Sequence, residues 1–65
     1  MYKNLLAEMA RNNIMQMDLV KELKISPSTL SDKMNGKKDF KLKECKTIKL
    51  IFFPDCTIDY LFETN

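Results

Sequence analysis

The 65-residue sequence contains no histidine and no tryptophan, and it has only one glycine, two prolines and two cysteines. Without histidine, the chain lacks both the commonest general base and the commonest metal ligand, so we expect neither an enzyme nor a metal-binding protein. The shortage of glycine and proline leaves few turn residues for a β-sandwich or barrel, which favours a helical fold. No uninterrupted apolar run is long enough to cross a bilayer.

The two cysteines, Cys45 and Cys56, show no CxxC spacing and have no histidine to complete a zinc site. We therefore expect two reduced thiols in or near the core, and no cofactor. Residues 1–4 lead directly into an amphipathic pattern, without the layout of a signal peptide. The expected location is cytoplasmic, on the nucleoid if the protein binds DNA.

The net charge of +2 conceals an uneven distribution along the chain. Residues 1–32 carry four basic and four acidic side chains, whereas residues 33–49 carry seven lysines and two acids, a net charge of +5. Residues 50–65 carry three acids and no base, a net charge of −3. A basic centre of this kind indicates a surface for a polyanion, although lysine-rich stretches are also typical of solvated helix faces.

Apolar spacing and capping residues predict four or five helices in one domain that covers residues 1–65. The first helix should end at Asn12 and Asn13, since asparagine tolerates the left-handed conformation. The second should begin near Gln16 and end at 23–24. The fourth should end before Pro54, and Thr57 should cap a last short helix over 58–62.

The third helix has the strongest local signal. Ser26 is a favourable N-cap and Pro27 suits the first helical position, so a helix should begin there and end before Asn35 and Gly36. Its apolar stripe is only Leu30 and Met34. Such a polar helix gains little from burial, which indicates that it is held by its neighbours and displayed for another purpose.

Residues 16–37 resemble the lambdoid-repressor-like, Cro/cI-type (XRE) family of helix-turn-helix DNA-binding domains, with the motif at 16–35. The similarity extends to the closing segment at 53–62, and thus covers nearly the whole chain. The matching residues of the motif are Gln16, Leu19, Val20, Leu23, Ile25, Ser26, Leu30, Ser31, Asn35, Gly36 and Lys37.

The resemblance implies double-stranded DNA as the partner and residues 27–34 as the recognition helix. The implied base contacts are Pro27, Ser28, Thr29, Asp32 and Lys33. The implied phosphate contacts are Gln16, Ser26, Asn35, Lys37, Lys38 and Lys41. The family binds as two-fold dimers, which would place two recognition helices about one DNA turn apart, ~34 Å.

The chain departs from the family pattern at three positions. Lys24 stands where glycine is usual, and a non-glycine residue there should be strained by ~1 kcal/mol. Met15 stands where serine or threonine often caps the second helix. The recognition face carries Asp32 and no arginine or glutamine, and a carboxylate can accept from cytosine N4 but repels phosphate.

Large side chains are concentrated near the end of the sequence, more than a bundle of this size can bury. We therefore expect part of them to form a dimer interface. The expected interface residues are Phe53, Ile58, Tyr60, Leu61 and Phe62.

The sequence thus predicts an all-α, lambda-repressor-like domain that binds specific duplex DNA as a homodimer. Its expected role is to regulate transcription as the repressor of a phage or prophage promoter. The alternative is a protein-interaction module that keeps the fold and has weak or no specific DNA binding. The neutral charge of the recognition helix, with Asp32 present and no arginine, supports that alternative.

Overall fold

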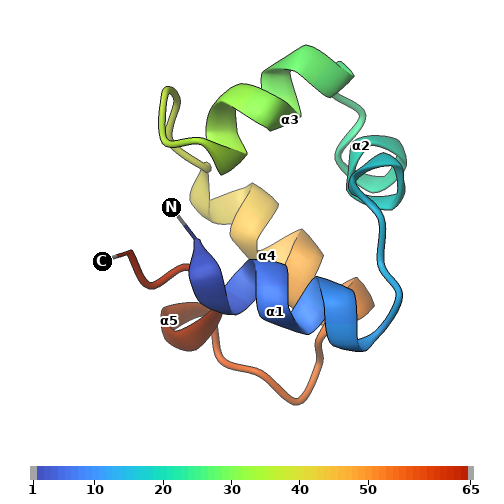
Figure 1. Cartoon of the computed structure of the whole chain (residues 1–65), viewed down its shortest axis with the longest axis vertical. Coiled ribbons are helices and arrows are strands. Elements are labelled where there is room, and N and C mark those ends of the chain that lie inside the picture. The colour runs from blue at the N-terminus through green and yellow to red at the C-terminus, as the bar shows by residue number, and fades with distance from the viewer. Residues whose placement is uncertain (1, 65) are drawn as a thin grey trace.

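A computed structural model describes residues 2–64, over which the chain forms five α-helices and no strand. The helices are α1 (Lys3–Arg11), α2 (Gln16–Leu23), α3 (Pro27–Met34), α4 (Leu42–Phe52) and α5 (Ile58–Leu61). In Figure 1, α3 lies across the top, α2 is seen nearly end-on at the right, and α1 lies in front of α4 with α5 at the lower left. The all-helical class predicted from the sequence is confirmed.

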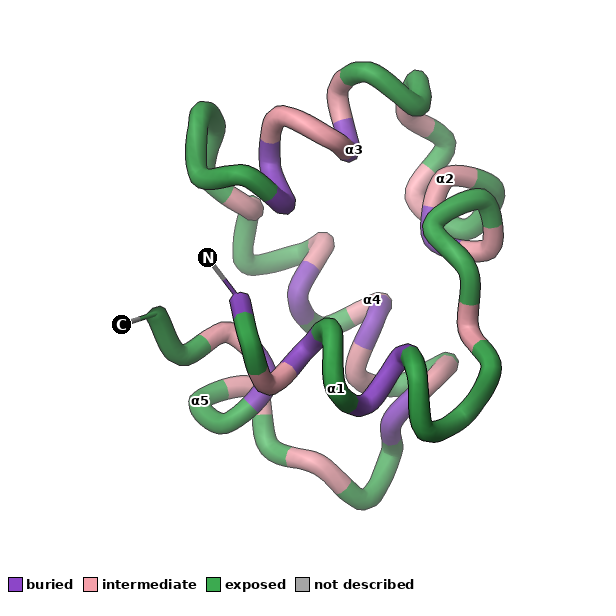
Figure 2. Tube along the Cα trace, in the orientation of Figure 1, coloured by how far each residue is buried: buried purple, intermediate pink, exposed green. Residues whose placement is uncertain are grey.

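The core takes one completely buried aliphatic side chain from each helix. These five residues, which have no exposed surface, are Leu5, Leu19, Leu30, Ile48 and Leu61. Burial of a leucine or isoleucine side chain contributes about 1.5–3 kcal/mol, so every helix, however short, is tied to the common core. Figure 2 colours buried positions purple, and each helix contains at least one of them.

Two turns use the left-handed conformation at residues other than glycine. Asn13 ends the α1 segment with φ 56°, and Lys24 ends α2 with φ 57°. Both positions were predicted from the sequence, Asn13 as a helix stop and Lys24 as a strained substitute for glycine. The strain at Lys24 is the greater, since asparagine visits this region more readily than lysine.

Helix N-termini are capped largely as expected. Oγ of Ser26 accepts from the Thr29 N–H at 3.1 Å, and Oγ1 of Thr57 accepts from the Tyr60 N–H at 3.1 Å. At α2 the Met15 side chain supplies no cap, as its chemistry requires, but Oδ2 of Asp18 accepts from the Met15 N–H at 2.8 Å. The acid at the third helical position therefore caps the N-terminus of α2 by accepting from the backbone N–H that precedes the helix.

Three aromatic rings join distant parts of the chain. Tyr2, Phe40 and Phe62 pack edge to face, with centroids 5.3, 5.8 and 5.1 Å apart for the pairs 2–40, 2–62 and 40–62. Phe40 belongs to the segment between α3 and α4, so this cluster fixes the end of that segment to both α1 and the residues after α5. Such edge-to-face pairs add about 0.5–1.5 kcal/mol to the burial of their area.

Candidate nucleic-acid interface

The connection between α2 and α3 presents the polar helix at the surface. Only Lys24, Ile25 and Ser26 separate the two helices, and the left-handed Lys24 turns the chain so that α3 packs against α2. Leu30 and Met34 face inward, as predicted, and are 0% and 5% exposed. The outer face of α3 therefore consists of polar side chains, and any partner of this face would contact those.

Three hydroxyl groups form a connected cluster at the N-terminal end of α3. The Ser26 hydroxyl donates to Thr29 Oγ1 at 2.8 Å, and Ser26 Oγ lies 3.2 Å from Ser28 Oγ. Ser28 is exposed together with Pro27, while Thr29 is half-buried. The structure thus brings three of the predicted contact residues together, with orientations already fixed by their mutual hydrogen bonds. Hydroxyls can donate or accept, which suits them to base edges and phosphates alike.

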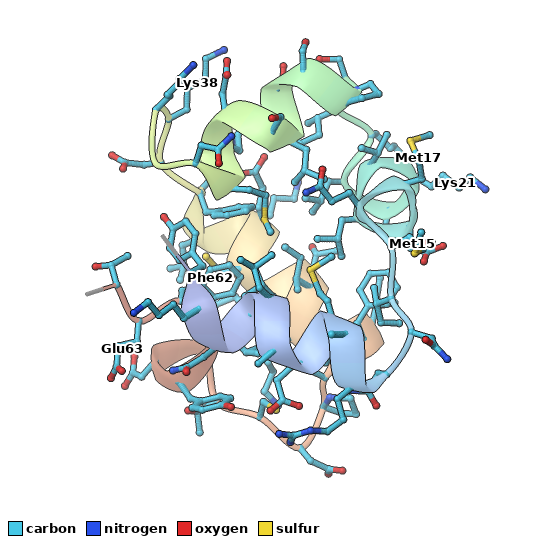
Figure 3. The ribbon with its side chains drawn as sticks, viewed as in Figure 1. Met15, Met17, Lys21, Lys38, Phe62 and Glu63 are labelled. Atoms are coloured by element: carbon cyan, nitrogen blue, oxygen red, sulfur yellow. The ribbon has the colours of Figure 1, made fainter. Side chains whose placement is uncertain are left out.

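A second cluster surrounds the C-terminal end of α3 and the segment 35–41, which we call the basic loop. The backbone N–H groups of Lys37 and Lys38 donate to the Asp32 carbonyl at 2.8 and 3.3 Å. The Lys38 ammonium lies 3.9 Å from Asp32 Oδ2, and Asn35 Nδ2 lies 3.4 Å from Ser31 Oγ. Figure 3 shows Lys38 on the basic loop, beside the outer side of α3 that carries Asp32.

The predicted phosphate contacts are all exposed. They are Gln16, Ser26, Asn35, Lys37, Lys38 and Lys41. Gly36 takes φ 81° in the basic loop, a conformation that L side chains rarely adopt, so glycine is required at this point. Exposure makes these side chains available to a partner.

Lys33 is not available to a partner, and the prediction that it contacts bases is wrong. Its side chain is buried, and its ammonium donates to Oε1 of Glu44 on α4. The reason is its place on the helix, one residue before the inward-facing Met34, where a long stem can reach across to α4. The sequence offered one clue, because Glu44 lies three residues after Lys41 in capping-box spacing.

Glu44 holds two partners with one oxygen. Its Oε1 accepts from Lys33 Nζ and also from the Lys41 N–H at 2.9 Å, which closes the N-terminus of α4. Burial acts to raise the pKa of Glu44, but the hydrogen bonds from Lys33 and from the Lys41 backbone, with the charges of both lysines, outweigh it and lower the pKa below its usual value. Glu44 is therefore held as a carboxylate.

A groove of about 450 Å³ lies beside this ion pair, between the end of α2 and the start of α4. It mixes charges of both signs over an aliphatic floor. The lining residues are Glu22, Leu23, Lys24, Ile25, Lys41, Lys43, Glu44 and Thr47. Lys41 thus lies on the groove and on the basic loop at once.

The predicted dimer interface is wrong at two of its five residues. Phe53 and Leu61 are 2% and 0% exposed and belong to the core, because the turn after α4 folds both side chains inward. Phe62 is partly buried in the aromatic cluster and Ile58 is half-buried. Tyr60 keeps 39% of its surface exposed.

Exposed aliphatic side chains lie on α4, although their spacing suggested the apolar side of that helix. Leu42, Leu50 and Ile51 are 63%, 67% and 50% exposed. Leu50 lies nearly opposite the buried Cys45 and Ile48 on the helix, whereas Leu42 and Ile51 lie on the two flanks of that buried side.

No helix within residues 2–64 has both the length and the apolar character needed to cross a membrane. Comparison with family models, with curated proteins and with solved structures finds no match to this chain.

Proposed function

We propose that the protein is a helix-turn-helix, lambda-repressor-like domain that binds specific sequences of double-stranded DNA as a homodimer and regulates transcription, repressing a phage or prophage promoter by occupying it. The observation that carries the proposal is α3 itself. It is a polar helix with two inward apolar residues, displayed beside α2 through a three-residue turn. A short helix displayed in this way suits insertion into a major groove.

The exposed lysines would supply most of the affinity. Lys37, Lys38 and Lys41 would neutralise phosphates, with further hydrogen bonds from Gln16, Ser26 and Asn35. Base preference would come from Ser28, Thr29 and Asp32 beside Pro27. The dimer contact would use the accessible parts of Ile58, Tyr60 and Phe62, and it would set the two copies of α3 ~34 Å apart.

The proposal is tested by selecting binding sites from random duplexes and measuring two variants on the selected and on random DNA. Lys38→Ala should weaken binding similarly on both and reduce the salt slope by about 1, because a phosphate contact carries no sequence information. Thr29→Ala should instead change which sequences are preferred. Lys46→Ala is the matched control, an exposed lysine on α4 outside the interface, and should leave both affinities unchanged.

Equal losses for Lys38→Ala and Thr29→Ala on selected and random duplexes would contradict these roles. Absence of any log-linear salt response would contradict DNA binding as a whole.

The second candidate is a protein-interaction module, and it is favoured by Leu42, Leu50 and Ile51 on the outer side of α4. This candidate predicts that Leu50→Ser abolishes a contact with another protein. It also predicts that the unsubstituted protein shows no salt-dependent binding to DNA.

A further inference from the structure

Lys33 and Glu44 join the two ends of the basic loop. Lys33 lies two residues before the loop begins, and Glu44 lies three residues after it ends. Their ion pair is the one ion pair within residues 2–64 that connects α3 to α4. Because Glu44 Oε1 also accepts from the Lys41 N–H, a single oxygen holds both the last turn of α3 and the last residue of the loop.

Besides this ion pair, α3 and the basic loop are held by α2 on one side and by Phe40 in the aromatic cluster at the far end of the loop. In the described part of the chain, the helix packs directly against α2, and its backbone does not approach α4 closely. Leu30 and Met34 anchor it to the core, but aliphatic contacts are not directional. The hydrogen-bonded ion pair is directional, and it links the last turn of α3 to the first turns of α4.

A buried ion pair contributes little net stability, because the cost of removing two charges from water offsets their attraction. What such a pair can contribute instead is a defined orientation of the two segments that it joins. We propose that Lys33 and Glu44 are positioning residues, which align α3 and hold the basic loop for its contacts with DNA without supplying much of the stability of the fold. The role in DNA binding rests on the proposed function, whereas the holding of the loop does not.

The test replaces both charges at once. In Lys33→Met/Glu44→Gln the aliphatic stem remains, and the glutamine carbonyl can still accept from the Lys41 N–H, but no ion pair forms. We expect a urea midpoint close to that of the original protein. The Lys37 amide, which donates to the Asp32 carbonyl, should exchange its hydrogen about tenfold faster, and affinity for the selected duplex should fall about tenfold.

Three comparisons separate this role from a general loss of structure. The Leu61 amide on α5 should exchange at an unchanged rate in the double variant. Lys33→Arg, which keeps the charge, should restore slow exchange at Lys37 and DNA affinity. Arg11→Met, which breaks the other ion pair to a buried carboxylate, should change neither quantity.

Unchanged exchange at Lys37 in the double variant would overturn the proposal. So would a double variant that fails to fold, since the pair would then supply stability and not direction. If the original protein binds no duplex, the proposed function fails while the exchange measurements still decide whether the pair holds the loop.

Discussion

The hydroxyl of Tyr60 on α5 donates a 2.8 Å hydrogen bond to Oε2 of Glu8 on α1, across 52 positions of sequence. Glu8 is only 6% exposed, and the same oxygen accepts from Arg11 Nη1 at 3.0 Å. A carboxylate that would be costly to bury alone is thereby satisfied. Asn4 adds a second link, since its Nδ2 donates to the Tyr60 carbonyl at 2.9 Å. The four-residue α5 is thus held to α1 by polar contacts as well as by Leu61.

This contact predicts a loss of stability at high pH. The hydrogen bond to Glu8 raises the pKa of Tyr60 above its usual 10.0, so the folded state favours the protonated phenol. The resulting stabilisation is complete below about pH 10 and is lost as the pH rises through the raised pKa. Urea unfolding between about pH 8 and pH 11 should show a steeper alkaline decline for the original protein than for Tyr60→Phe. Identical declines would contradict the assignment.

The contribution of Tyr2 to the alkaline loss of stability must be distinguished from that of Tyr60. Its pKa is also raised, by burial first and then by the nearby Asp39 and Cys45, so part of the alkaline decline should survive in Tyr60→Phe. Tyr2→Phe is the matched comparison, and the two substitutions together should remove the tyrosine part of the decline and leave the part that belongs to the buried Cys45 thiol, whose pKa is also raised.

The backbone at Lys24 predicts a stabilising substitution. Its φ of 57° costs a lysine about 1–2 kcal/mol, and the greater freedom of unfolded glycine returns part of this, so Lys24→Gly should raise the free energy of unfolding by about 0.5–1 kcal/mol. Asn13→Gly is the control, because asparagine at φ 56° is already tolerated and the gain should be smaller. Chemical denaturation of both variants measures the difference, and a larger gain at Asn13 would refute the explanation.

These examples show what the sequence could and could not predict. Local features were accessible, because the Ser26 cap, Pro27 and the cap at Thr57 depend on neighbours within a few residues, whereas the left-handed turn at Lys24 was expected only from the family resemblance. The pairing of Lys33 with Glu44, eleven positions apart, and of Tyr60 with Glu8 was not accessible. Which side of a helix turns inward depends on where the other helices lie.

The end of the chain illustrates the same limit. The excess of large side chains over 53–62 predicts an interface there, but Phe53 and Leu61 are in the core. Counting apolar residues predicts that some must be exposed. It does not predict that Leu50 on α4 is one of them, because this follows only from the packing of α4 against α2 and α5.

The two thiols should differ in reactivity. Both are free, with Cys45 buried and Cys56 partly exposed. Burial first, and then the charge of Glu44, raise the pKa of Cys45, which keeps it protonated and weakly nucleophilic. Iodoacetamide under native conditions should label Cys56 well before Cys45, and both should react at similar rates in urea. Peptide mass spectrometry measures the order, and prior labelling of Cys45 would show that the core opens more readily than its packing indicates.

Asp32 is the residue at which the proposed contact of α3 with DNA is tested most directly. Its Oδ2 lies 3.9 Å from the Lys38 ammonium, so under the proposed function the one acid on the outer side of α3 would compete with phosphate for a lysine of the basic loop. If α3 enters the groove as proposed, Asp32→Asn should raise affinity for random duplex by roughly two- to fivefold, the value of an exposed ion pair. It should also relax any preference for cytosine at one position of the half-site, since a carboxylate accepts from cytosine N4.

The control is Asp55→Asn, which makes the same charge change at an exposed turn away from α3 and should have neither effect. Fluorescence anisotropy with labelled duplexes measures both effects, and an equal gain from Asp55→Asn would mean that Asp32 acts through net charge alone and does not face the DNA.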